Sequence, residues 1–201
     1  MKIKQIVLLI IGVCCLCTLG VAQGLDLDDE DRQEPKKVNP LHANGLNYVG
    51  VGFEIGPTLN RRRFGQPVHF GLPVKVYLGR EKKGRFLVRT GIHYFPVPAE
   101  RRFAGYSHSF TTIVPLAIGY RRNIGDWYLE GSLGAALTTE AAIYKDASLG
   151  KSRIAYREIN YGVEIGKQIG DFDLGLSLYN TGPIPFHILC AGIKTSYRIK
   201  W

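Results

Sequence analysis

The chain has 201 residues, of which 45% are hydrophobic and 21% charged, and its formal net charge at pH 7 is +9. This size and composition are ordinary for one folded domain, and the 24 glycines with 11 tyrosines and 9 phenylalanines indicate many strands. Three of the four cysteines lie in the N-terminal segment, so export would leave Cys190 alone and exclude an intramolecular disulfide.

The N-terminal segment has the layout of a secretory signal peptide. Lys2 and Lys4 precede an uncharged run that ends in small residues near Ala22, so residues 1–22 are expected to be removed on export. An uncleaved membrane anchor is the alternative, because the run is almost long enough to span a bilayer. The small residues at its end favour the signal peptide. Residues 23–45 are charged and have no hydrophobic period, which predicts a flexible leader.

From residue 46 to 201 apolar and polar residues alternate with the period of β-strands. In Val68–Gly79 (VHFGLPVKVYLG) every even position is apolar, and the odd positions are mostly small or polar. Most segments of this kind are near the roughly nine to eleven residues that a tilted membrane strand needs. The eight segments are residues 48–56, 68–79, 86–95, 110–120, 127–137, 159–166, 172–179 and 189–201.

The connections and the aromatic residues decide between a soluble and a membrane barrel. Long links alternate with short ones, which puts long loops at one end and tight turns at the other, as in outer-membrane barrels. With the apolar face outward, aromatic residues form two outward rings, typical of interfacial girdles. The sequence therefore predicts an all-β fold, an eight-stranded antiparallel up-and-down transmembrane β-barrel. The expected rings are Phe86, Tyr120, Trp127, Phe172 and Trp201 at the short turns, and Phe70, Tyr94 and Phe110 at the long loops.

Two segments carry a family resemblance: Pro115–Gly134 (PLAIGYRRNIGDWYLEGSLG), which reads as a hairpin, and the C-terminal YRIKW. With them, residues 46–201 resemble the small outer-membrane β-barrel proteins of Bacteroidota, the PorT-like group, with a barrel of the OmpA/OmpX size. The resemblance implies the outer membrane of a Gram-negative cell and assigns no activity. It also implies that Tyr197 and Trp201 form the signal read by the barrel-assembly machinery.

The inward positions carry charges of both signs. Eight strands leave a lumen just wide enough for side chains to fill, and an unpaired charge there would be costly. We therefore expect ion pairs that close the lumen. The six residues are the acids Glu54, Glu130 and Glu164 and the bases Lys75, Arg89 and Lys194.

Two prolines and two histidines stand out within the expected strands. Pro73 and Pro115 each remove a ladder hydrogen bond, so we expect β-bulges there. His69 and His93 face the lumen near the long-loop end and should be opposite or diagonal neighbours. Two histidines without a third ligand make a weak metal site, so polarity at the rim is the simpler interpretation, and no metal or cofactor is expected.

One segment, Tyr106–Phe110 (YSHSF), is a candidate for catalysis at the outer rim. Ser107, His108 and Ser109 are adjacent, so neighbouring side chains point to opposite faces of an extended chain. A nucleophile and its base need contact and an orienting third group, and the sequence offers none. The sequence therefore predicts a protein that is not an enzyme.

The expected function is a structural or interaction role through basic loops. Exposed arginines in the first two long loops would attract outer-membrane lipid, anionic glycolipid or an unidentified protein partner, whereas an exported protein does not meet nucleic acid. A narrow channel is the alternative, with a lipid-modifying enzyme as a third class, but ion pairs across the lumen argue against a channel. The loop residues are Arg61, Arg62, Arg63, Arg101 and Arg102.

Overall fold

A computed structural model gives the structure of residues 47–200, apart from residues 82–83 and 184–186. The expected signal peptide, the expected leader and Trp201 lie outside the described residues. Among the described residues, no helix is long and apolar enough to cross a membrane.

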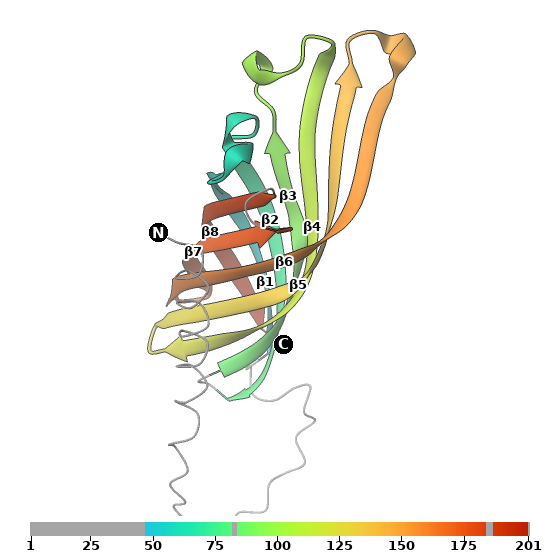
Figure 1. The fold of residues 1–201 in the computed structure, drawn as a ribbon. Helices are drawn as coiled ribbons and strands as arrows, with labels where there is room; N and C mark the ends of the chain where they lie inside the picture. The colour runs from blue at the N-terminus through green and yellow to red at the C-terminus, as the bar shows by residue number, and fades with distance from the viewer. Residues whose placement is uncertain (1–46, 82–83, 184–186, 201) are drawn as a thin grey trace, which may run out of the picture. The chain divides into compact units, whose positions relative to one another are not determined.

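The described chain forms a closed antiparallel barrel in which each strand pairs with its neighbours in sequence (Figure 1). Closure comes from the first and last strands, which pair from Tyr48 opposite Lys200 to Ile55 opposite Ile193. The predicted fold class is thus confirmed. The strands are β1 (Tyr48–Pro57), β2 (Val68–Glu81), β3 (Gly84–Pro96), β4 (Tyr106–Ile124), β5 (Trp127–Tyr144), β6 (Lys151–Ile169), β7 (Phe172–Thr181) and β8 (Ile188–Lys200).

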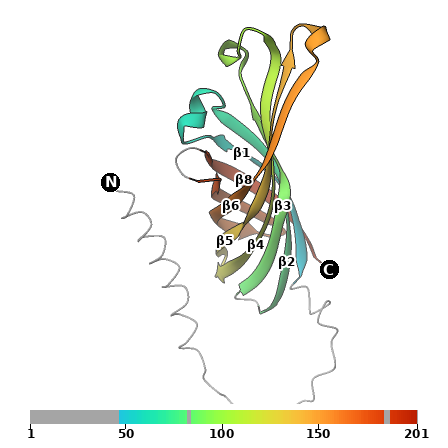
Figure 2. The same ribbon diagram turned by 45° about the vertical axis from the view of Figure 1, so that its right-hand side comes forward.

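Strands β4, β5 and β6 are longer than the sequence pattern indicates. They have 19, 18 and 19 residues, and their upper halves rise above the neighbouring strands in both views (Figures 1 and 2). The expected long loop between β5 and β6 is mostly strand, with the short 3-10 helix η4 (Ala147–Leu149) at its tip. In the first half of β6, Ile154 and Ala155 lie on opposite faces and both are exposed, so apolar residues are not confined to one face there.

Apolar side chains cover the outside of the barrel. Phe86, Leu116 and Ile118 are 70%, 65% and 71% exposed. A soluble protein rarely exposes a continuous apolar surface of this kind to water. The outward aromatics pair across strands near the two ends, with ring centroids 5.1–5.4 Å apart. This is the surface of a barrel that faces lipid. The pairs are Phe86 with Tyr120 and Phe172 with Tyr197 at the short turns, and Tyr94 with Phe110 at the long loops.

The bulges expected at the two prolines are absent. Pro115 lies opposite Ala136, and the register between β4 and β5 is the same on both sides of it. Pro73 lies opposite Gly91, whose φ of 136° favours glycine. A Cβ at Gly91 would lie 2.4 Å from the carbonyl oxygen of Leu72, so the glycine lets the strands approach at the proline. The register shifts that do occur lie at the ends of β2 and β4.

Candidate functional site: the closed lumen and the basic loops

Glu164 of β6 is the centre of a buried ionic network in the lumen. The ammonium group of Lys75 in β2 donates to Glu164 Oε2 at 2.7 Å and also to Glu130 in β5. The ammonium nitrogen of Lys194 in β8 lies 2.5 Å from Glu164 Oε1. All four side chains are almost fully buried. The structure therefore brings four of the six expected lumen residues into one network that crosses the barrel.

Tyrosines complete the shell of this network. Tyr128 and Tyr179 donate their hydroxyl hydrogens to Glu164 at 2.8 and 2.9 Å, and Tyr77 donates to Glu130 at 2.5 Å. Their rings fill lumen volume while their hydroxyl groups satisfy the carboxylates. The sequence pattern puts all three on the inner face, but it does not indicate which carboxylate each one reaches.

A second group of charges lies around Arg121, one residue past the strand expected at residues 110–120. The guanidinium lies 2.6 Å from Asp173 Oδ2 and 3.3 Å from Glu130 Oε1, and it donates to the hydroxyl of Tyr48 at 2.8 Å. Its carbon Cζ stacks 3.6 Å from the ring centroid of Tyr128. Because β4 continues past the expected end of the strand, Arg121 reaches the lumen rather than solvent.

The remaining two expected residues make other contacts. Arg89 donates to the side-chain oxygen of Asn160, and its Cζ lies 3.9 Å from the ring centroid of Tyr179. Glu54 pairs with His69, whose Nε2 lies 3.1 Å from Glu54 Oε1, rather than with a lysine or an arginine. Among the described residues, Glu54 has no lysine or arginine partner, and Arg89 has no carboxylate partner.

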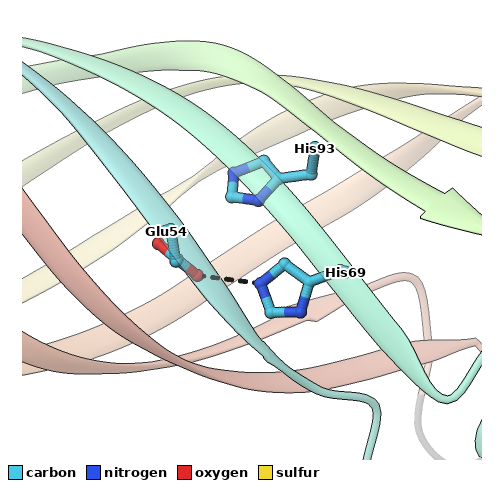
Figure 3. Close-up of side chains that lie close together, drawn as sticks. All are labelled: Glu54, His69 and His93. Atoms are coloured by element: carbon cyan, nitrogen blue, oxygen red, sulfur yellow. Dashed lines mark hydrogen bonds and ion pairs between the residues drawn. The ribbon is translucent and has the colours of Figure 1, made fainter.

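Glu54, His69 and His93 form a compact cluster at the long-loop end of the lumen (Figure 3). One ligand atom from each lies within 4.8 Å of the others. The histidines are diagonal neighbours, as expected, because His93 lies opposite Gly71 in the β2–β3 register. Their exposed fractions of 0% and 5% show that they are buried residues rather than rim polarity. Two imidazoles and a carboxylate are a donor set able to hold a divalent metal ion.

The basic loops enclose an open pocket of about 450 Å³ between the β1–β2 and β3–β4 connections. Each connection contains a short 3-10 helix, η2 (Arg61–Phe64) and η3 (Ala99–Arg101). The charged residues that line the pocket are Arg61, Arg62, Arg101, Arg102 and Glu140.

The loop arginines differ in what they bind. Arg62 pairs with Glu140; burial would lower the pKa of Arg62, but this hydrogen bond and the carboxylate charge raise it above its ordinary value. Arg101 donates to the carbonyl oxygens of residues 63 and 64 at 2.9 and 3.0 Å, which ties the two loops together. Arg102 donates to two carbonyl oxygens at 2.9 and 2.6 Å. Arg61 and Arg63 are exposed, and Arg63 lies outside the residues that line the pocket.

The structure also describes the contacts of the YSHSF segment and of Tyr197 in the expected assembly signal. Ser107 of the YSHSF segment donates its hydroxyl hydrogen to the carbonyl oxygen of Ile143 at 3.1 Å, and not to a histidine. Tyr197 of the expected assembly signal points outward, 47% exposed, and its ring packs on Phe172.

Comparison with solved structures defines the class of the fold. The chain matches the crystal structure of Ail, the attachment invasion locus protein of Yersinia pestis, with a TM-score of 0.55 and 11% identity over 76% of this chain and 97% of that one. It also matches OprG from Pseudomonas aeruginosa with a TM-score of 0.49 and 10% identity, over 76% of this chain and 95% of that one. The match with Ail, together with the closed barrel described above, shows that the chain has the fold of the small eight-stranded outer-membrane β-barrels. It matches no protein-family model and no curated protein sequence.

Proposed function

We propose that the protein is an outer-membrane barrel with a closed lumen, whose basic loops bind a phosphorylated or sulfated glycan. The observation that carries the proposal is the pocket lined by Arg61, Arg62, Arg101 and Arg102, with Glu140 as the acid among its lining residues. Guanidinium groups bind phosphate and sulfate oxygens through charge-assisted, often bidentate hydrogen bonds.

The charge of this pocket supports an anionic ligand. Glu140 neutralises Arg62, whereas Arg101 and Arg102 donate to neutral carbonyl oxygens and keep their full charge. Arg61 has no carboxylate partner among the described residues. Three positive charges around one open cavity favour a ligand with several anionic groups.

Export and assembly belong to the same proposal. Residues 1–22 act as the signal peptide, and Tyr197 with Trp201 directs folding by the barrel-assembly machinery. Membership of the PorT-like group is the family assignment that we propose, on the resemblance of Pro115–Gly134 and the C-terminal end.

A sulfated sugar is a suitable probe of the pocket. Ail from Yersinia pestis, which shares the fold, has been solved in complex with the heparin analogue sucrose octasulfate. In this chain the pocket arginines would bind the sulfate groups of such a sugar. We expect the purified barrel in detergent to bind sucrose octasulfate in isothermal titration calorimetry. Added salt should weaken binding, because exposed charges are screened over about 8–10 Å near physiological ionic strength.

The double variant Arg61→Ser/Arg101→Ser should bind this probe about tenfold or more weakly, because it removes two of the arginines that line the pocket and their charge-assisted contacts. The matched control is Lys151→Ser/Arg153→Ser, which removes the same charge from exposed positions of β6 away from the pocket. Equal weakening in both variants would mean that binding depends on the net charge of the protein and not on this pocket. Unchanged affinity in the Arg61/Arg101 variant would contradict the proposed site.

A further inference from the structure

We propose that Glu54, His69 and His93 form a binding site for a divalent transition-metal ion, with Zn²⁺ as the best match, inside the barrel. The three residues come from β1, β2 and β3, and Figure 3 shows their side chains converging on one point of the lumen. This inference is independent of glycan binding at the loops.

Two of the proposed ligand atoms are already about as far apart as two ligands on one Zn²⁺ ion. His69 Nε2 and Glu54 Oε1 are 3.1 Å apart, and donors around a tetrahedral Zn²⁺ with bonds of about 2.0–2.1 Å lie about 3.3 Å from one another. The ligand atom of His93 is within 4.8 Å of both. A side-chain rotation of His93 that moves this atom by about 1–2 Å would complete a three-ligand face.

Unsatisfied polar atoms gather on these same three residues. Glu54 Oε2, His69 Nδ1 and His93 Nδ1 are buried and have no hydrogen-bond partner among the described residues. Buried polar atoms without partners are rare, because each one loses its hydration without compensation. The Glu54–His69 pair accounts for one atom of each residue and gives His93 Nδ1 no partner. A cation held by Glu54, His69 Nε2 and His93 Nδ1 would give that nitrogen a ligand role, and a bidentate carboxylate would also use Glu54 Oε2.

Two glycines make room for the cluster. Gly71 lies opposite Glu54 in the β1–β2 register and opposite His93 in the β2–β3 register. A Cβ at Gly71 would be 2.9 Å from His93 Nδ1 and 3.2 Å from Glu54 Cβ, and a Cβ at Gly192 would be 2.6 Å from Glu54 Oε1. A larger residue at Gly71 would collide with His93 and Glu54, and one at Gly192 would collide with Glu54.

Residues around the cluster orient the carboxylate of Glu54, and the nearby lysine and arginine are bound to other partners. Ser177 donates its hydroxyl hydrogen to Glu54 Oε1 at 2.9 Å, the kind of outer-shell contact that fixes a metal ligand. Lys194 lies opposite Glu54 in the β1–β8 register, but its ammonium group is bound to Glu164. Arg89 is bound to Asn160. A metal ion here would tie β1, β2 and β3 together across the upper lumen.

Metal titration of the folded barrel tests the proposal. The protein carries a tag without histidine, is folded into detergent, treated with EDTA and titrated with Zn²⁺ by calorimetry and with Co²⁺ by visible absorption. We expect one Zn²⁺ per chain, a higher unfolding temperature with Zn²⁺, and Co²⁺ absorption bands of a low-symmetry site. His69→Gln and His93→Gln should abolish binding, and Ser177→Ala should weaken it about 10- to 100-fold.

Two variants outside the ligand set sharpen the test. Gly71→Ala keeps every ligand but should weaken binding, since its methyl group would collide with His93. His108→Gln removes an exposed histidine and should leave binding unchanged. Heat-modified gel mobility reports whether each variant folds. Absent binding by the unmodified chain, or binding that survives both histidine replacements, would overturn the proposal.

If the histidine variants fail to fold, X-ray absorption at the zinc edge of the Zn²⁺-loaded unmodified chain decides. Scattering from two imidazoles supports the site. Scattering from fewer than two imidazoles overturns it.

Discussion

Replacement of Glu164 with Gln is expected to lower the unfolding free energy of the barrel by about 3–5 kcal/mol. The carboxylate accepts from Lys75 and Lys194 and from two tyrosines in a region closed to water. An amide leaves Lys194 as a buried charge without its carboxylate, which is far more costly than loss of an exposed pair. Denaturant unfolding of the barrel in detergent, followed by tryptophan fluorescence, measures the change.

The control for this variant is Asp171→Asn at the short-turn end. Asp171 pairs with Lys200, and both side chains are about half exposed. The same acid-to-amide change there should leave the unfolding midpoint nearly unchanged, because water screens the pair. If Glu164→Gln is as mild as Asp171→Asn, the buried network does not stabilise the barrel.

Replacement of Arg121 with Met should also lower the unfolding free energy by about 3–5 kcal/mol. The change leaves Asp173 without its 2.6 Å contact, takes a donor from Tyr48, and removes the cation stacked on Tyr128. Asp173 then keeps only the weaker contact with Arg198, at 3.3 Å, among the described residues. Denaturant unfolding again gives the magnitude.

The matched control is the next residue in the chain. Arg122 lies on the opposite face of β4 and is exposed, so Arg122→Met should change stability by no more than about 0.5 kcal/mol. Similar losses at positions 121 and 122 would mean that strand β4 as a whole tolerates arginine replacement poorly, and would contradict the specific role of the buried guanidinium.

The fold could be predicted because lipid and lumen impose opposite polarities on alternate residues. That alternation identifies the inner face of β2 correctly, from His69 to Tyr77. It fails in the first half of β6, where Ile154 and its neighbours are exposed on both sides. It fails also at Arg121, one residue past the expected end of its strand.

The lumen contacts were harder to predict than the faces. A short connection indicates that His69 and His93 are neighbours, since it limits the β2–β3 register. The third member, Glu54, depends on the β1–β2 register across a long loop, which sequence spacing does not determine. Likewise, the balance of inward charges predicts that ion pairs form but does not predict which residues pair. Arg89 binds Asn160 where a carboxylate was expected.

Conductance of the purified barrel in planar lipid bilayers tests whether the lumen is closed. The side chains of Lys75, Arg121 and Glu164 cross the lumen and bind partners on other strands, so no continuous water path is expected. We expect no stable openings for the unmodified protein. Lys75→Ser/Arg89→Ser should destabilise the barrel and admit small ions. Steady, sizeable conductance by the unmodified protein would mean that the lumen is open and that the barrel is a channel.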